Sequence, residues 1–229
     1  MKKNILAAAA FAVSFTLLQA CNDGSTTSKE TTTDTTANKD AMNHDMKGND
    51  MPEHNEMMTK MDNDMKAVKM TGDFDLDFAS MMIPHHQSAV DMAEMYLAKG
   101  KDEKIKTMAQ NIINSQKKEI EDLKTMITNH KSGEVKKEHS NGGHGADGHN
   151  ELMDAMNKMM ADMKAMKMSG DADKDFVTMM IPHHQSAVDM AENEISHGKN
   201  VEMKKFSQKV INDQSKEIKE FENWLSSKK

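Results

Sequence analysis

The side chains in this sequence best suited to chemistry are histidines and methionines that recur in one short motif. The segment MMIPHHQSAVDMAE occurs twice without change, at residues 81–94 and 179–192. In a helix, each histidine of the adjacent pair follows a methionine by one turn, and a further methionine lies two turns beyond the first histidine. The candidate metal ligands are therefore Met81, Met82, His85, His86 and Met92 in the first copy and Met179, Met180, His183, His184 and Met190 in the second.

This donor set indicates a soft or borderline metal ion. Imidazole binds zinc, copper, iron and nickel, whereas thioether sulfur selects soft ions such as Cu(I). We therefore expect copper, as Cu(I) in the first place, with other soft or borderline ions as alternatives. Adjacent histidines are about 100° apart around a helix, so the two rings of one pair are not expected to share an ion. Pro84 and Pro182 directly precede the pairs and are expected to kink the helix there.

The same residues also have purely structural explanations. Methionine forms helices well and fills irregular cores, so most of the methionine stripe is expected to be packing. A single inward histidine is commonly a hydrogen-bonded core residue. Gln116 and Gln214, which are polar residues on an apolar stripe, are expected to hydrogen-bond a buried partner, and a motif imidazole is one candidate.

The two motifs belong to a longer internal repeat. Residues 57–127 align with residues 155–225 at a constant offset of 98 without a gap, and 38 of the 71 positions are identical. Each copy reads as three helices: a short methionine-striped helix, a second from about residue 75 to 99 that carries the motif, and a third from about residue 102 to 129 with apolar heptads. The predicted fold is all-α, a four-helix bundle of two repeated hairpins with the short first helices at its ends or sides.

Glycines and aspartates mark the predicted ends and starts of the helices in each copy. Gly72 and Gly170 are expected to end the first helices, and Gly100 or Gly198 the second. Aspartates stand between, at positions 73, 75, 77, 171, 173 and 175, where carboxylates suit a helix N-cap. A calcium loop is disfavoured, because its glycine and terminal glutamate are absent.

Composition limits the class of protein further. Leu, Ile, Val and Phe together number 34 of 229 residues, and the 26 methionines raise that total to 60, so the core must be largely thioether. Nine aromatic residues are too few for a β-sandwich or barrel. The formal net charge of −7 becomes −9 if Lys2 and Lys3 are removed with a signal peptide, which makes nucleic acid an unexpected partner.

The N-terminus is typical of an exported protein. Lys2 and Lys3 precede an apolar run from Ile5 to Leu18 that is too short to span a bilayer but suits a secretory signal. The run ends in Leu18-Gln19-Ala20-Cys21, which resembles a bacterial lipobox, and Cys21 is the one cysteine in the chain. We therefore expect a lipoprotein signal peptide at 1–20 and a lipid anchor at Cys21 that holds the protein on a membrane of the bacterial cell envelope, facing the periplasm or the exterior. Ordinary signal cleavage that leaves Cys21 free is the alternative.

The remaining chain divides into four segments. We predict a disordered tether at 21–53, a first helical repeat at 54–130, a His/Gly-rich linker at 131–150 and a second helical repeat at 151–229. Histidines and methionines of the tether and linker are candidates for weak metal capture: Met42, His44, Met46, Met51, His54, His139, His144 and His149.

The duplicated motif, followed by Ile113-Asn114-Ser115-Gln116 and by Ile211-Asn212-Asp213-Gln214 in the third helices, resembles the family catalogued as domain of unknown function 305. The resemblance covers both repeats and implies a ferritin-like helical bundle that is usually exported. It also implies a link to periplasmic copper binding and resistance through methionine and histidine. Carried over by position, the family's histidine pair is His85-His86 and His183-His184.

The motif, the repeat and the N-terminal sequence are compatible with three functions. The leading one is a non-enzymatic, metal-binding lipoprotein that sequesters or carries copper; its partners are the metal ion and the membrane, and a copper-handling protein partner is left unidentified. The second is a ferritin-like oxidase, which needs Glu-x-x-His on two helices and two further glutamates; here Glu194-x-x-His197 occurs once, and Tyr96 replaces the glutamate in the first copy. The third is a helical interaction module without a metal role.

Overall fold

A computed structural model describes residues 52–132 and 144–228 of the chain. Every secondary-structure element in these ranges is a helix, so the expected all-α class is confirmed. The six helices are α1 (Pro52–Lys66), α2 (Phe74–Leu97), α3 (Glu103–Ser132), α4 (His144–Ala165), α5 (Ala172–His197) and α6 (Val201–Ser227). The predicted signal peptide, Cys21 and most of the predicted tether lie outside the described residues. No described helix is both long enough and apolar enough to cross a membrane.

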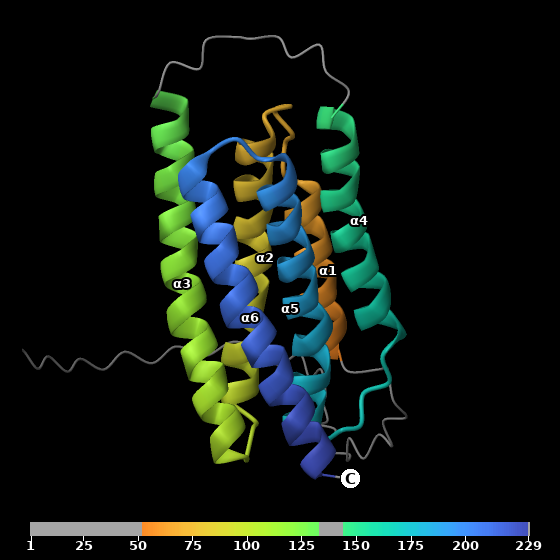
Figure 1. The fold of residues 1–229 in the computed structure, drawn as a ribbon. Coiled ribbons are helices and arrows are strands. Elements are labelled where there is room, and N and C mark those ends of the chain that lie inside the picture. The colour runs from red at the N-terminus through yellow and green to blue at the C-terminus, as the bar shows by residue number, and fades with distance from the viewer. Residues whose placement is uncertain (1–51, 133–143, 229) are drawn as a thin grey trace, which may run out of the picture. The chain divides into compact units, whose positions relative to one another are not determined.

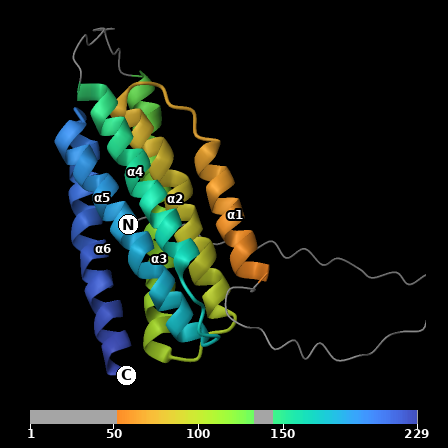
Figure 2. The same cartoon turned by 90° about the vertical axis from the view of Figure 1, so that its right-hand side faces the viewer.

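The helices form the expected bundle of two antiparallel hairpins (Figure 1). α2 packs along α3, α5 packs along α6, and the contact of α2 with α5 joins the two hairpins. The first helix of each repeat lies along the side of the bundle: α1 packs on α2, and α4 packs on α5 (Figure 2). The motif helices α2 and α5 are therefore the innermost helices, because each is covered by neighbours from both repeats.

The helix starts follow the predicted capping chemistry. Asp73 caps α2 by accepting from the backbone N–H of Leu76 at 3.1 Å, and Asp171 caps α5 in the same way. Asp77 folds back instead and accepts from the N–H of Thr71 at 2.6 Å and of Gly72 at 2.9 Å. Gly72 has φ +84°, a conformation that costs glycine little, so it forms this turn rather than the helix end.

The first helices end before these glycines, which differs from the expectation. α1 ends at Lys66, and α4 ends at Ala165. After each end a tight turn closes, from Val68 N–H to the Met65 carbonyl and from Met166 N–H to the Met163 carbonyl. The chain then runs on to the glycine in a short connection.

The core contains the predicted methionine stripe. All ten motif ligand candidates are buried, together with Phe78 and Tyr96 from the same face of α2. The apolar heptad of α3 is also turned inward, with Ile105, Ile112 and Leu123 fully buried. Pro84 and Pro182 lie inside continuous helices, so each helix runs through its proline. Flexible thioethers fill this interior where a larger protein would use more leucine and phenylalanine.

The second repeat begins earlier than the sequence indicates, because α4 starts at His144, inside the segment expected to be linker. Gly148 explains the close packing there, since an added Cβ would lie 2.8 Å from the ring of Phe74. The ring of His149 packs edge-on against Phe74 with centroids 5.4 Å apart, and its Nε2 lies 2.7 Å from Asp77. These contacts hold the first turns of α4 against the start of α2.

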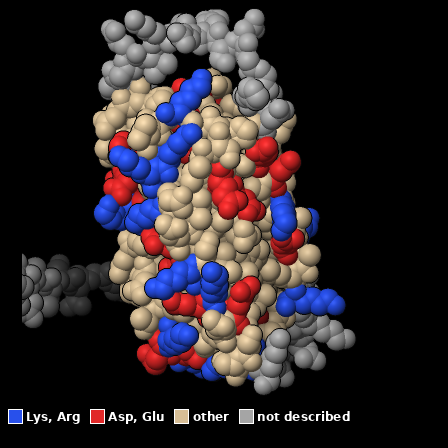
Figure 3. Space-filling view, in the orientation of Figure 1, with Lys and Arg blue, Asp and Glu red and all other residues tan. Residues whose placement is uncertain are grey.

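An aspartate of each repeat also accepts hydrogen bonds from the turn between the second and third helices of the other repeat. Asp75 accepts hydrogen bonds from the backbone N–H groups of residues 199 and 200, in the α5–α6 turn, at 2.9 and 2.8 Å. Asp173, its repeat equivalent, accepts from those of residues 101 and 102, in the α2–α3 turn, at 2.8 and 3.1 Å. The two hairpins are thus related by an approximate twofold symmetry that the outer surface does not share in charge detail. On the face in Figure 3, lysines are mixed with acidic side chains.

Candidate metal centre

The first histidines of the two motifs meet in the middle of the bundle. His85 on α2 and His183 on α5 are both 0 % exposed, and their ring centroids lie 4.0 Å apart with the planes inclined at 48°. They are the same position of the repeat, and the packing of α2 on α5 brings them together. Burial, followed by the nearby histidines, holds the pKa of both rings well below the usual range. Both imidazoles are therefore neutral at pH 7, the form that coordinates metal ions.

A serine fixes which nitrogen of His183 is free. The Ser88 hydroxyl donates its one hydrogen to the His85 carbonyl at 2.7 Å. The same oxygen lies 2.7 Å from Nε2 of His183. With the hydroxyl hydrogen on the His85 carbonyl, this nitrogen is the N–H donor. Nδ1 of His183 then carries the bare lone pair, and it has no hydrogen-bond partner. A neutral imidazole oriented by a partner on its other nitrogen is the usual arrangement of a metal ligand.

His85 has a different environment from its repeat equivalent. Neither of its ring nitrogens has a hydrogen-bond partner, although the residue is fully buried. Ser186, the counterpart of Ser88, donates to the carbonyl of Ala155 at 3.2 Å instead. A buried polar group without a partner costs about 1–3 kcal/mol. The unpartnered nitrogens of His85 and Nδ1 of His183 are thus available as ligands for a metal ion.

The second histidines point away to carboxylates. Nε2 of His86 lies 3.0 Å from Oε2 of Glu119 on α3, and Nε2 of His184 lies 2.8 Å from Oε2 of Glu217 on α6. Within each pair the ring centroids are more than 6 Å apart, at 6.2 and 6.4 Å. Burial would raise the pKa of Glu119, but hydrogen bonds from His86 and Lys209 outweigh it, so the pKa lies below its usual value.

The glutamates were missed in the sequence, where the glutamines one turn earlier were expected to hydrogen-bond a buried partner, with a motif imidazole as one candidate. That expectation is wrong for Gln214, whose amide oxygen and nitrogen are both buried without partners, and the amide oxygen of Gln116 is also buried without a partner. A carboxylate accepts a stronger hydrogen bond from an imidazole N–H than an amide does. The available signal was that Glu119 and Glu217 stand at equivalent positions of the repeat.

A groove between α3 and α6 reaches these polar groups. It encloses about 200 Å³ and is lined by residues that include Gln116, Glu119, Gln214 and Glu217. Both carboxylates that hold the second histidines therefore line a space open to solvent.

A larger cavity of about 500 Å³ collects methionines from both repeats. Met92 and Met179, two of the predicted ligands, line it together with His54, Met95 and Met168. His54, a candidate for weak metal capture at the first position of the predicted repeat 54–130, lies in α1, where it is 9 % exposed and Nδ1 has no partner. Burial lowers its pKa, so this imidazole is also neutral at pH 7. The other predicted methionines, Met81, Met82, Met180 and Met190, are buried in the core.

One further cluster of potential ligands lies at the end of the bundle. Ligand atoms of Asp73, Asp75 and His130 all lie within 4.8 Å of one another. Within residues 52–132 and 144–228, this is the one place where three or more His, Cys, Asp or Glu side chains converge so closely. The motif histidines therefore do not form a carboxylate-rich cluster among the described residues.

The chain is similar to a known protein family and to solved structures of copper- and silver-bound proteins. The family model described as Domain of unknown function (DUF305) matches residues 16–127 and 75–225. The solved structure of CopM in the Cu(II)-bound form is 34 % identical, with a TM-score of 0.50 over 67 % of this chain and 97 % of that chain. CopM in the Ag-bound form, obtained by co-crystallization, is 33 % identical, with a TM-score of 0.50 over 67 % and 96 %.

A DUF305 protein from Streptomyces coelicolor is 20 % identical, with a TM-score of 0.52 over 69 % of this chain and 94 % of that chain, and shares the fold. No curated protein matches the chain.

Proposed function

The chain belongs to the DUF305 family, and from that premise we propose that it binds copper as Cu(I) through its duplicated motif and sequesters or carries it in the bacterial cell envelope. The family relationship supports the link to copper, since CopM, at 34 % identity, has been solved in a Cu(II)-bound form and also in an Ag-bound form. The choice of residues and of oxidation state rests on the geometry of this chain.

The observation that carries the proposal is the buried contact of His85 with His183. Two neutral imidazoles 4.0 Å apart, with unpartnered nitrogens, offer a low-coordinate site in an interior rich in thioether. Moving an ion from water into an apolar interior is costly, and the cost rises steeply with its charge. Because no carboxylate among residues 52–132 and 144–228 converges on this pair, a monovalent soft cation suits it better than a divalent one.

The other motif residues supply supporting roles. His86 and His184 contact Glu119 and Glu217, two carboxylates that line the α3–α6 groove. The cavity lined by His54, Met92 and Met179 offers a second thioether-rich site closer to solvent. Soft ions captured there would reach an imidazole and sulfur donors from both repeats.

We propose a binding role and not an enzymatic one. A ferritin-like oxidase needs several carboxylates and histidines around one pair of metal ions. The described residues form one such converging group, and it contains no motif histidine. The lipid anchor at Cys21 and the envelope location rest on the N-terminal sequence.

Anaerobic Cu(I) titration against a coloured competing chelator tests the proposal. We expect the double variant His85→Gln/His183→Gln to lose the tightest site. The matched variant His86→Gln/His184→Gln, altered at the adjacent positions, should lose far less affinity. Circular dichroism establishes that both remain folded. Unchanged copper content and affinity in a variant that lacks all four histidines would show that the motif is not the copper site.

A further inference from the structure

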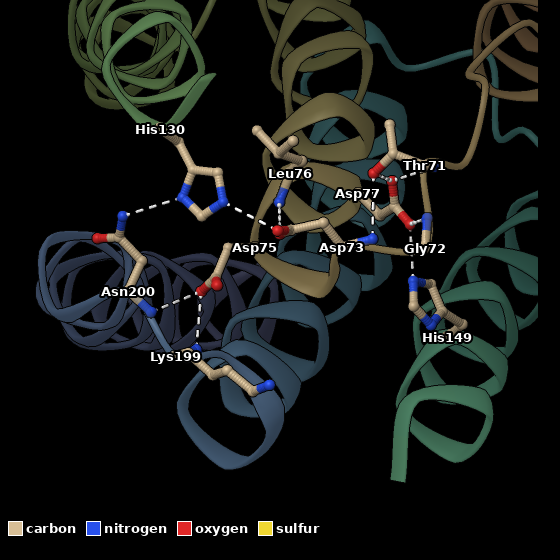
Figure 4. A network of polar contacts seen from close by, with 10 residues as sticks. All are labelled: Thr71, Gly72, Asp73, Asp75, Leu76, Asp77, His130, His149, Lys199 and Asn200. Atoms are coloured by element: carbon tan, nitrogen blue, oxygen red, sulfur yellow. Dashed lines mark hydrogen bonds and ion pairs between the residues drawn. The ribbon is translucent and has the colours of Figure 1, made fainter. Parts of the chain in front are cut away.

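The end of the bundle nearest the α4 start holds a cluster of acidic side chains around His130 (Figure 4). Nε2 of His130, near the C-terminus of α3, lies 2.9 Å from Oδ2 of Asp73 at the start of α2. Nδ1 of the same ring lies 3.3 Å from Nδ2 of Asn200 in the α5–α6 turn. Asp75 joins from α2, with its Oδ1 held by backbone N–H groups of that turn. The start of α2 and the end of α3 thus bring two carboxylates and an imidazole within 4.8 Å.

A fourth side chain, Glu194 of α5, is buried against this cluster without a donor. It is 0 % exposed, and neither carboxyl oxygen has a hydrogen-bond partner. The carboxyl group of Glu194 is in contact with that of Asp75. Two carboxyl groups in contact in a dry site, with Asp73 close by, need either a proton or a cation between them.

At the opposite end of the bundle, the equivalent positions of the repeat carry side chains that satisfy the carboxylates. There the position of Glu194 is taken by Tyr96, whose hydroxyl donates to Asp173 at 2.7 Å. The position of His130 is taken by Lys228, whose ammonium lies 3.1 Å from Asp102. The opposite end therefore provides a donor, Tyr96, and a permanent cation, Lys228.

At the α4 end, Glu194, an acceptor, stands in place of the Tyr96 donor, and the imidazole of His130 stands in place of the Lys228 ammonium. Both replacements remove positive character and add a group that can ligate a metal ion. Gly198 leaves room for the change, because an added Cβ there would lie 2.0 Å from Glu194 Oε1, as one at Gly100 would lie 2.2 Å from the Tyr96 ring. The two ends thus share a backbone and differ in charge.

We propose that Asp73, Asp75 and His130 bind a divalent cation of the Mn²⁺ or Zn²⁺ class, with the Glu194 carboxylate adding its charge beside Asp75. Carboxylate oxygen suits Mn²⁺, and a single imidazole is compatible with either ion. Ligands at about 2.1 Å from one ion are at most roughly 4.2 Å apart, so the three side chains need to close in only slightly. The ion takes the place of the proton on Nε2 of His130, which moves to Nδ1, and the long hydrogen bond to Asn200 is given up.

This site is separate from the copper proposal in place and in donor type. It is formed by oxygen and one imidazole at the bundle end, whereas the motif histidines lie in the middle and are surrounded by thioethers. Mn²⁺ is the right probe because thioether and imidazole clusters hold it weakly. Loss of Mn²⁺ binding and loss of Cu(I) binding are therefore independent results.

The test is titration of the full chain, in detergent, with Mn²⁺ alone, following free Mn²⁺ by electron paramagnetic resonance. We expect one Mn²⁺ per chain and at least about tenfold weaker binding in Glu194→Gln, which keeps the shape but removes the charge. His130→Lys and Glu194→Tyr, which copy the opposite end, should bind no Mn²⁺ there.

Tyr96→Phe, at the opposite end, is the control and should bind as the parent chain does. Thermal melting with and without Mn²⁺ gives a second readout, because an ion that binds the folded state raises its stability. The proposal is overturned if the parent chain binds no stoichiometric Mn²⁺, or if Glu194→Gln and His130→Lys bind it unchanged. In that case Glu194 is a protonated partner of Asp75.

Discussion

The imidazole rings of His85 and His183, 98 positions apart in the chain, lie 4.0 Å from centroid to centroid in the closed interior of the bundle. One repeat alone supplies only one of the two imidazole rings. The duplication supplies the second ring, and the packing of α2 on α5 aligns the two motifs across an approximate twofold axis. The copies are not equivalent, because Ser88 orients His183 while Ser186 turns to the Ala155 carbonyl.

That asymmetry predicts different effects for two serine substitutions. Ser88→Ala removes the hydroxyl that holds Nε2–H of His183, so Nδ1 is no longer fixed as the free lone pair. Loss of such a partner typically weakens metal binding by about 10–100-fold. Cu(I) competition titration measures the change, and Ser186→Ala is the matched control, expected to bind copper as the parent chain does. Equal copper affinities for the two serine variants would contradict the assigned role of Ser88.

The carboxylate partners of the second histidines should differ in their effect on stability. Glu119 is nearly buried and bonds both His86 and Lys209, whereas the side chain of Glu217 is 25 % exposed and bonds His184. Glu119→Gln is expected to lower the free energy of unfolding by about 1–3 kcal/mol, because a charged partner of a buried imidazole is lost. Glu217→Gln should cost less. Urea denaturation at pH 7 compares the two, and a larger loss for Glu217→Gln would count against the assignment.

The buried imidazoles predict an acid-sensitive fold. Burial sets the folded-state pKa of His85 and His183 below the unfolded value of about 6.5, so the unfolded chain binds more protons below that pH. Their contribution is fully present above about pH 6.5 and is lost as the pH falls. Each ring should reduce the free energy of unfolding by up to about 1.4 kcal/mol per pH unit.

Denaturation of the metal-free chain between pH 7 and pH 5 measures this slope. His85→Gln/His183→Gln should flatten it, because glutamine does not titrate. The His197→Gln variant is the control, since His197 pairs with Glu151 near the surface and should leave the slope in place. An unchanged slope in the double variant would mean that other groups cause the acid sensitivity.

Much of the fold follows from local patterns in the sequence. The 3–4 spacing of apolar residues reports which face of a helix is buried, so the stripe from Phe78 to Tyr96 and the heptad of α3 are confirmed. Aspartate capping depends on neighbours three residues away, and Asp73 is confirmed as the N-cap of α2. The repeat made the two-hairpin architecture predictable, because identical segments fold alike.

What the sequence does not contain is the register between helices. The contact of Glu119 with His86 depends on how far α3 slides along α2, which no local pattern sets. The start of α4 was missed because its first turn is stabilised by Phe74 and Asp77, far away in the chain. Glu194 was read as a fragment of a carboxylate motif on α5, whereas it lies against Asp75 in the first turn of α2.

The central claim is that His85 and His183 together bind one copper ion. X-ray absorption spectroscopy of the chain loaded with one equivalent of Cu(I) reads the donor atoms directly. We predict a low-coordinate Cu(I) with imidazole scattering that disappears in His85→Gln/His183→Gln and persists in His86→Gln/His184→Gln. An imidazole signal that survives in the first variant would contradict the claim and place the copper elsewhere in the chain.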